Sequence, residues 1–261
     1  MTYAGQKATF DAVAARYDAV RPSYPESLVQ AVIDLTGLPE EGRILEIGCG
    51  TGQATLPFAS RGYRLLCLEP GRNLADVAAH NLRAYPWVTI QSVTFEDWSP
   101  EEEAFDLVMS AQAFHWIPAE IGYPGAARAL KPAGSIALFW NLSETEEESA
   151  MWAEIQQVYV ERAPELAQTG DSRLATKVYG LEKQLGAQTA HFRDVTIRQF
   201  PWSTHYDTAQ YIDLLNTYSD HLTLAEDRRK RLHGGIARVI ERHGGSLVKP
   251  YVAVLLIAHK A

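Results

Sequence analysis

With 261 residues, 46% of them hydrophobic and 21% charged, the chain can bury a sizeable core without disulfides or a structural metal. Its 24 lysines and arginines against 32 aspartates and glutamates leave a net charge of −8, which repels phosphate backbones and argues against a nucleic-acid partner. The opening residues lack the apolar stretch of a signal peptide, and the late apolar run at 252–258 is too short to cross a bilayer, so we expect a soluble cytoplasmic protein without a membrane partner.

Short apolar runs alternate with helical stretches in the first half of the chain. This alternation predicts a parallel sheet covered by helices on both faces, with right-handed crossovers. The segment "LKPAGS" at 130–135 contains a proline and a glycine that predict the end of a helix before the fifth strand. The predicted strands occupy residues 43–47, 63–69, 87–93, 105–110 and 135–140.

After Trp140 the pattern becomes helical. Ser143 with Glu146, and Thr145 with Glu148, form two overlapping capping boxes that predict the start of an amphipathic helix. We therefore expect inserted helical material in this part of the chain.

The sheet is predicted to resume towards the carboxyl terminus. Apolar residues alternate at 191–200, which favours a strand. Thr223 and Glu226 form a third capping box, which predicts a helix that closes at the glycine pair 244–245. Residues 251–259 then have the composition of a buried final strand.

The segment "RILEIGCGTGQATLPFA" at 43–59 places three alternate glycines directly after a strand. Glycines there let a ligand approach the backbone, and the following helix would aim its N–H groups at that ligand. The dinucleotide fingerprint requires a glycine where this chain has Gln53, so a pyrophosphate is disfavoured. Glu46 lies two residues before the first glycine, where a carboxylate suits a cationic amino-acid group better.

This acidic-x-Gly-x-Gly-x-Gly loop resembles the first motif of the class I S-adenosylmethionine (SAM) dependent methyltransferases. The resemblance implies that SAM is the cofactor and S-adenosylhomocysteine the product, that the glycine loop holds the methionine part, and that Glu69 accepts the ribose hydroxyls. It also implies adenine contacts from the turn "VTFEDW" and a pocket-lining glutamine in "SAQAFHWI". The cofactor residues implied are Glu46, Gly48, Cys49, Gly50, Gly52, Gln53, Glu69, Pro70, Phe95, Glu96 and Gln112.

The amino-terminal segment "FDAVAARYDAVRPSYP" resembles the lid of one branch of this family, methyltransferase type 11, which includes the trans-aconitate methyltransferase-like proteins. The resemblance implies that Tyr17, Arg21 and Tyr24 close over the cofactor carboxylate and the acceptor, with Arg21 in a bidentate ion pair. The alternative is a packed amphipathic helix in which Arg21 holds a carboxylate elsewhere.

The resemblance further implies a fold and a division of the chain. We expect a doubly wound, Rossmann-like α/β sheet of seven strands, mostly parallel with an antiparallel last strand. A lid would comprise residues 1–34, the SAM-binding core 35–142 and 189–261, and a helical cap over the acceptor 143–188.

Methyl transfer is an in-line displacement that chiefly requires alignment, so no catalytic residue is strictly needed. His115 is the candidate general base for an acceptor that is protonated at neutral pH, although it could instead pack within its loop. Trp116 and Trp140 are placed at strand exits, where they could line an acceptor pocket. The basic run at 228–231 could attract an anionic acceptor, but a solvated helix face with Glu226 paired to Lys230 is the stronger interpretation.

The leading hypothesis is therefore an enzyme that methylates O, N or C of a small molecule, with a carboxylate as one candidate acceptor. A non-catalytic SAM-binding regulatory module and an NAD-dependent oxidoreductase remain as alternatives. Cys49 and Cys67 lie in apolar runs without metal-ligand spacing, so we expect buried thiols and no metal. The oligomeric state, monomer or homodimer, stays open.

Overall fold

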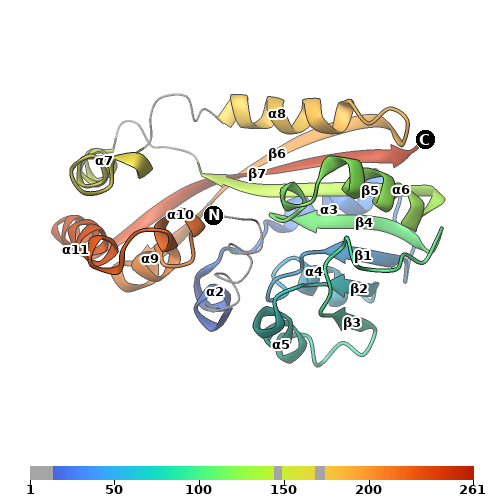
Figure 1. Cartoon of the computed structure of the whole chain (residues 1–261), viewed down its shortest axis with the longest axis horizontal. Helices are drawn as coiled ribbons and strands as arrows, with labels where there is room; N and C mark the ends of the chain where they lie inside the picture. Colours follow the sequence, from blue (N-terminus) through green and yellow to red (C-terminus); the bar gives the residue numbers. More distant parts are fainter. Residues whose placement is uncertain (1–13, 144–148, 168–173) are drawn as a thin grey trace. The chain divides into compact units, whose positions relative to one another are not determined.

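The computed structural model describes residues 14–143, 149–167 and 174–261, and its strands form one seven-stranded sheet (Figure 1). The strands follow the order β3-β2-β1-β4-β5-β7-β6, with β7 antiparallel, which confirms the predicted sheet. Their bounds are β1 Arg43–Ile47, β2 Arg64–Leu68, β3 Val88–Gln91, β4 Phe105–Ala111, β5 Leu130–Ser143, β6 Phe192–Asp207 and β7 Ser246–Lys260.

The strand order creates a switch point beside β1. The chain runs from β1 outward to β2 and β3, then returns to place β4 on the other side of β1. Parallel register sets Glu46 of β1 beside Cys67 of β2 and Met109 of β4. In open α/β sheets, ligands bind outside the carboxyl ends of the strands at such a switch point.

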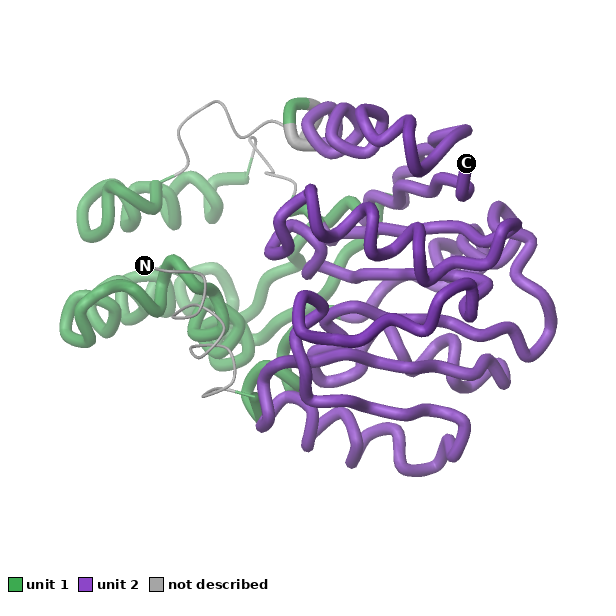
Figure 2. Tube along the Cα trace, turned by 45° about the vertical axis from the view of Figure 1, so that its right-hand side comes forward, with its two compact units in different colours: residues 1–22, 142–177, 201–252 green, residues 23–141, 178–200, 253–261 purple. Residues whose placement is uncertain are grey.

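The chain forms two compact units (Figure 2). Unit 1 contains residues 1–22, 142–177 and 201–252, and unit 2 contains residues 23–141, 178–200 and 253–261. The predicted division into a lid, a core and a helical cap was drawn at other boundaries, and the roles it assigns stay predictions.

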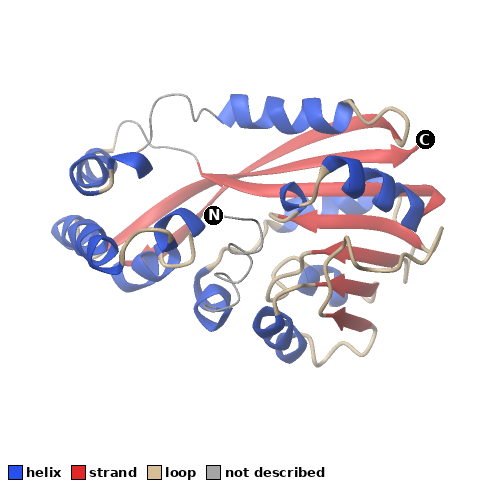
Figure 3. Cartoon of the chain, viewed as in Figure 1, coloured by secondary structure: helices blue, strands red, loops and turns tan. Residues whose placement is uncertain are grey.

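Helices alternate with strands along unit 2, as the sequence predicts (Figure 3). The fully buried side chains of its core come from strands and helices alike, among them Leu28, Phe58, Phe105 and Phe139. The elements are α3 Glu26–Thr36, α4 Thr55–Ala59, α5 Arg72–Asn81, the 3₁₀ turn η1 Phe114–Trp116, α6 Ala119–Ala129 and most of α8 Leu174–Gly186.

Unit 1 has its own apolar core, in which tyrosines and tryptophans are prominent. Trp152, Tyr206, Tyr211 and Tyr251 are all buried within it. The helices of this unit are α2 Ala14–Val20, α7 Ala150–Arg162, the 3₁₀ turn η2 Pro164–Leu166, α9 Thr208–Leu215, α10 Ser219–Leu222 and α11 Glu226–Arg242.

The helix starts differ from the predicted capping boxes. Helix α11 begins at Glu226 as expected, but the Thr223 hydroxyl donates to the carbonyl of Asp220 over 2.6 Å and caps nothing. Thr223 ends α10, so its side chain is already engaged there. The boxes of Ser143 with Glu146 and of Thr145 with Glu148 include residues outside the described part of the chain.

A capping box that was not predicted from the sequence forms at the start of α9. Asp207 accepts from the backbone N–H of Gln210 over 2.8 Å, and the Gln210 side chain accepts from the N–H of Asp207 over 2.9 Å. Elsewhere, no helix among the described residues is both long and apolar enough to cross a membrane.

Candidate functional site

The glycine loop connects β1 to α4 in a left-handed backbone path. Gly48, Gly50 and Gly52 have φ values of +72°, +59° and +95°, a conformation that side chains strain. A Cβ on Gly48 would lie 2.4 Å from the Cβ of Ala113, which follows β4. Glycine is therefore required at position 48 because the backbone of the loop lies close to Ala113. The sequence predicted that a ligand imposes this requirement, whereas a contact within the protein already does so.

The backbone amides of the loop are mostly used inside the protein. Gly48 and Cys49 donate to the carbonyl of Leu68 over 2.8 and 3.3 Å, and Gly52 donates to the carbonyl of Cys49 over 3.0 Å. Helix α4 has only five residues, so its dipole at the loop is small. The sequence predicted that the N–H groups of the loop point towards a ligand, and this prediction is wrong for these three amides. A bound phosphate would need such N–H groups as hydrogen-bond donors.

Glu46 lies fully buried beneath this loop. Its Oε2 accepts from the Thr55 hydroxyl over 2.6 Å and from the Cys67 thiol over 3.7 Å. Its Oε1 has no hydrogen-bond partner. Burial raises the pKa of Glu46 to about 7, so a nearby cation would favour its charged form strongly.

Glu69, directly after β2, is held from both sides by the backbone. Its Oε2 accepts from the N–H of Gly50 over 2.9 Å, and its Oε1 accepts from the N–H of Gly71 over 2.8 Å. These two backbone donors fix the orientation of the Glu69 carboxylate at the carboxyl end of β2. Pro70 separates Glu69 from Gly71 and limits the backbone freedom of the turn.

The turn after β3 places Phe95 and Glu96 differently. The Phe95 ring is buried, with its centroid 6.0 Å from that of Trp98, and a Cβ on Gly125 of α6 would lie 2.8 Å from it. Phe95 thus packs within the protein. Glu96 follows it and has a buried Oε2 with no partner, so Glu96 is the better placed of the two for a ligand amino group.

Gln112 directly follows β4 and has a strained backbone conformation, with φ at +60°. Its backbone N–H donates to the carbonyl of Phe139 over 3.0 Å, and its Nε2 donates to the carbonyl of Asn141 over 3.1 Å. The Asn141 side chain in turn donates to the carbonyl of Ser23 over 2.9 Å. Asn141, which the sequence reading missed, therefore anchors the segment before α3 next to Gln112.

His115, Trp116 and Trp140 meet beyond β4 and β5. The indole N–H of Trp140 donates to Nδ1 of His115 over 3.2 Å, and the rings of His115 and Trp116 lie 4.7 Å apart. Burial lowers the pKa of His115 below its ordinary value of 6.5. Since Nδ1 accepts, the neutral ring carries its proton on Nε2, which makes Nε2 a donor and opposes the general-base role.

Tyr17 and Arg21, the two predicted lid residues that belong to unit 1, contact each other. The Arg21 guanidinium donates to the hydroxyl of Thr217 over 2.9 Å and to its carbonyl over 2.7 Å. It lies 4.8 Å from the ring centroids of both Tyr17 and Tyr218. Arg21 is thus held by Thr217 and by two rings in a packed arrangement, and its ion pair with the carboxylate of the cofactor stays a prediction.

Tyr24 and the basic run complete the predicted set. Tyr24 packs edge-on against Phe139 within unit 2, with ring centroids 4.8 Å apart. In the basic run, Lys230 pairs with Glu226 over 2.5 Å, as the solvated-face interpretation predicts. Arg228 pairs with both oxygens of Glu165 over 2.5 and 2.7 Å.

Unsatisfied buried polar atoms gather at the loop and the adenine turn. Among the described residues, five buried side-chain atoms have no hydrogen-bond partner, and four of them belong to these two segments of unit 2. Buried polar atoms are normally paired, so these atoms are candidate contacts for a ligand. The four atoms are Glu46 Oε1, Thr51 Oγ1, Gln53 Nε2 and Glu96 Oε2.

Thr51 and Thr55 belong to this site although the sequence reading did not single them out. The carbonyl of Thr51 accepts from Asn81 of α5 over 3.0 Å, which ties the loop to that helix. Thr51 lies inside the glycine loop and Thr55 lies just after it, and these positions could have identified both residues from the sequence. No group of three histidine, cysteine, aspartate or glutamate side chains with metal-binding geometry occurs in the described ranges.

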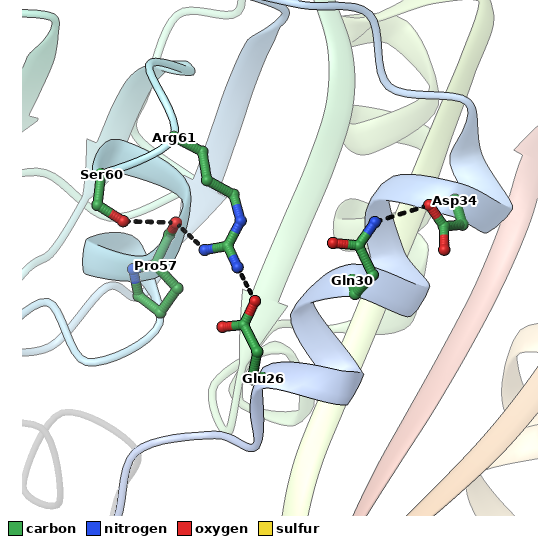
Figure 4. Close-up of polar contacts among 6 residues, drawn as sticks. All are labelled: Glu26, Gln30, Asp34, Pro57, Ser60 and Arg61. Carbon is green, nitrogen blue, oxygen red and sulfur yellow. Dashed lines mark hydrogen bonds and ion pairs between the residues drawn. The ribbon is translucent and has the colours of Figure 1, made fainter.

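The short helix α4 is anchored at its far end. Arg61 donates to the carbonyl of Pro57 over 2.6 Å and also bonds Glu26 of α3 (Figure 4). The hydroxyl of Ser60 donates to the same Pro57 carbonyl over 3.0 Å. This network fixes the helix that the glycine loop enters, so the loop is supported from both sides.

The chain is similar to known methyltransferases in sequence and shares its fold with solved structures. A methyltransferase domain family matches residues 44–134. An uncharacterised methyltransferase of Mycobacterium bovis is 25% identical over 255 residues, 96% of this chain and 95% of that protein. A trans-aconitate 2-methyltransferase of Variovorax paradoxus is 28% identical over 124 residues, 47% of this chain and 46% of that protein. The crystal structure of the YcgJ protein from Bacillus subtilis shares the fold, with a TM-score of 0.56 at 17% identity, covering 90% of this chain and 99% of that one.

The family domain spans the glycine loop, Glu69, the turn at 93–98 and β4. The sheet order, the acidic glycine loop and these similarities together identify the chain as a member of the class I SAM-dependent methyltransferases.

Proposed function

We propose that this enzyme methylates a small organic acceptor, and that it holds SAM in unit 2 at the carboxyl ends of β1, β2 and β4. The observation that carries the cofactor site is the group of four unpaired buried polar atoms on the glycine loop and the adenine turn. Three oxygens and one amide nitrogen make this a site that mainly accepts hydrogen bonds. Such a site suits the ammonium, the ribose hydroxyls and the adenine amino group of SAM.

Three carboxylates would each bind a different part of the cofactor. Glu46 would receive the ammonium, because its buried Oε1 needs a donor and its raised pKa falls when a cation binds. Glu69 would accept the ribose hydroxyls in the orientation that Gly50 and Gly71 impose. Glu96 would accept from the adenine amino group through its unpaired Oε2.

The methyl acceptor would be met by His115, Trp116 and Trp140. SAM supplies an electrophilic methyl group on a positively charged sulfur. The protein then has to align the acceptor with that methyl and exclude water, and ring contacts such as those of His115 with Trp116 favour both. With its proton on Nε2, His115 would donate a hydrogen bond to an acceptor oxygen and so orient it.

The two alternatives make different demands. An NAD-dependent oxidoreductase would need free loop amides for a pyrophosphate, and three of those amides are engaged within the protein. A SAM-binding regulatory module would need the same cofactor residues, so only turnover separates it from an enzyme. The net charge of −8 continues to favour a small molecule over a nucleic acid as acceptor.

The test is isothermal titration of the whole chain with SAM, S-adenosylhomocysteine and NAD. We expect micromolar binding of the first two and none of NAD, and loss of binding in Glu69→Ala. Glu101→Ala is the matched control, because Glu101 is an exposed carboxylate that pairs with Arg43 in the same unit. Binding of NAD alone, or equal SAM affinity in Glu69→Ala, would contradict the proposed cofactor site.

Turnover is tested separately by incubating the SAM-loaded protein with a panel of carboxylic acids, phenols and amines. Formation of S-adenosylhomocysteine that depends on one acceptor supports the enzyme. Tight SAM binding without product from any acceptor class would favour the regulatory module.

A further inference from the structure

One face of β7 in unit 1 has its polarity inverted. Side chains alternate across a strand, so Leu247, Lys249 and Tyr251 share one face and Val248 lies on the other. The first three are only 3%, 7% and 3% exposed, whereas Val248 is 49% exposed. A lysine therefore points inward between two buried apolar residues while a valine points to solvent, the opposite of what burial of apolar surface favours.

The Lys249 ammonium is surrounded by rings. Its Nζ lies 5.4 Å from the ring centroid of Trp152 and 5.2 Å from that of Tyr251. The Tyr251 ring also stacks on Trp202, with centroids 5.4 Å apart. Cation–π attraction offsets part of the cost of burial, but no carboxylate of the described residues lies within ion-pair distance of Lys249.

A second unpaired donor lies on one of these rings. The indole Nε1 of Trp152 is buried and has no hydrogen-bond partner, and it is the one such atom of the described residues that belongs to unit 1. Buried charged and polar groups are normally paired. The Lys249 ammonium and the Trp152 N–H thus lie at the same indole ring, and among the described residues the ammonium has no carboxylate partner and the N–H has no acceptor.

We propose that Lys249 and Trp152 form a binding site for an organic carboxylate. One carboxylate has two acceptor oxygens, which match one ammonium and one indole N–H, and its single negative charge matches the single positive charge. The surrounding aromatic side chains would cover a flat apolar body attached to that carboxylate. A phosphate dianion is a poorer fit, because it brings a second charge and more oxygens than these two donors satisfy.

This site does not depend on the proposed SAM site, because all of its residues belong to unit 1 and the cofactor residues belong to unit 2. The carboxylate has two sources in principle, a methyl acceptor or a regulatory ligand. Binding measured without SAM therefore tests the site itself, and methyl transfer to the bound carboxylate separates the two sources.

The experiment titrates the full chain with acetate, benzoate and cinnamate up to millimolar concentrations, and with the neutral analogues benzamide and cinnamamide. We expect benzoate or cinnamate to bind at least tenfold more tightly than its amide. Lys249→Met, which retains length and apolar packing, is expected to weaken that binding at least tenfold. Lys230→Met is the matched control, because Lys230 is exposed, pairs with Glu226 and belongs to the same unit.

The indole N–H of Trp152 gives an independent readout by NMR. Its resonance, assigned by its absence in Trp152→Phe, is expected to move downfield as benzoate binds, since a new hydrogen bond forms. Absence of binding by every carboxylate would overturn the site. So would unchanged affinity in a folded Lys249→Met protein, or binding that leaves the Trp152 N–H resonance unmoved.

Discussion

The indole N–H of Trp140 donates to Nδ1 of His115 over 3.2 Å, which joins two residues that the sequence separates by a helix and most of a strand. This bond assigns the ring proton of neutral His115 to Nε2. A protonated Nδ1 could not accept the bond, so the contact also favours the neutral form.

We therefore predict that His115 titrates below pH 6.5 as an Nε2–H tautomer. Trp140→Phe should raise its pKa, because the ring is retained while the donor to Nδ1 is lost. Long-range ¹H–¹⁵N NMR of the histidine side chains measures both the tautomer and the pKa. An Nδ1–H tautomer in the parent protein would restore the general-base role.

Glu46→Gln tests the buried carboxylate beneath the glycine loop. The pKa of Glu46 is about 7, above its ordinary value of 4.5, so the folded cofactor-free protein binds more protons than the unfolded chain between these values. Its contribution to stability is complete below about pH 4.5 and is lost as the pH rises through 7. Glu46→Gln should therefore flatten the pH dependence of unfolding and stabilise the free protein at pH 8 by roughly 2 to 3 kcal/mol.

The same substitution should weaken SAM binding at least tenfold. In the parent protein, SAM affinity should increase as the pH rises through about 7, because the ionised form of Glu46 receives the ammonium. Denaturant unfolding and isothermal titration between pH 5 and 8 provide the two measurements. Equal SAM affinity in Glu46→Gln and the parent would refute a contact between Glu46 and the ammonium.

Gly48→Ala should be strongly destabilising. The added Cβ would lie 2.4 Å from that of Ala113, on a backbone that is also left-handed. We expect a loss of about 3 kcal/mol, of which Ala113→Gly in the double variant should recover at least half. Gly62→Ala is the matched control: Gly62 has φ of +88° and open space at its Cβ, so it should lose only about 1 kcal/mol. Equal losses of stability in Gly48→Ala and Gly62→Ala would show that backbone strain causes the destabilisation and that the clash with Ala113 does not.

Lys249→Met should stabilise the protein, because it removes a buried ammonium that has no carboxylate partner among the described residues. Burial lowers the pKa of Lys249 to about 8 from 10.5, so between these values the unfolded chain binds more protons and stability rises with pH. The cost of the charged form is therefore greatest below about pH 8, where it is of the order of 3 kcal/mol.

The gain in Lys249→Met should thus be largest near pH 7 and should shrink as the pH approaches 10. Thermal unfolding of both proteins at these two pH values measures it. A lower melting temperature for Lys249→Met at pH 7 would mean that the ammonium stabilises the fold.

The sequence alone was sufficient for the sheet and for the cofactor family. The strands of the first half alternate with helices, and each is an apolar run that a parallel sheet must bury, so local patterning predicts them well. The acidic glycine loop is a local signal too, because its residues follow one another in the sequence and can be recognised as one motif. Helix starts were less predictable. The hydroxyl of Thr223 donates to the carbonyl of Asp220 in the preceding helix α10, and it therefore does not cap α11.

What each side chain does was decided by the tertiary structure. Gly48 is required by Ala113, the proton of His115 is assigned by Trp140, and Arg21 is held by Thr217, and all three partners are distant in sequence. Lys249 is buried only because β7 turns it inward. Local patterns predict which segments form strands and helices, but hydrogen-bond partners and pKa shifts depend on what the completed fold brings within a few ångströms, and that is why these roles could not be predicted from the sequence alone.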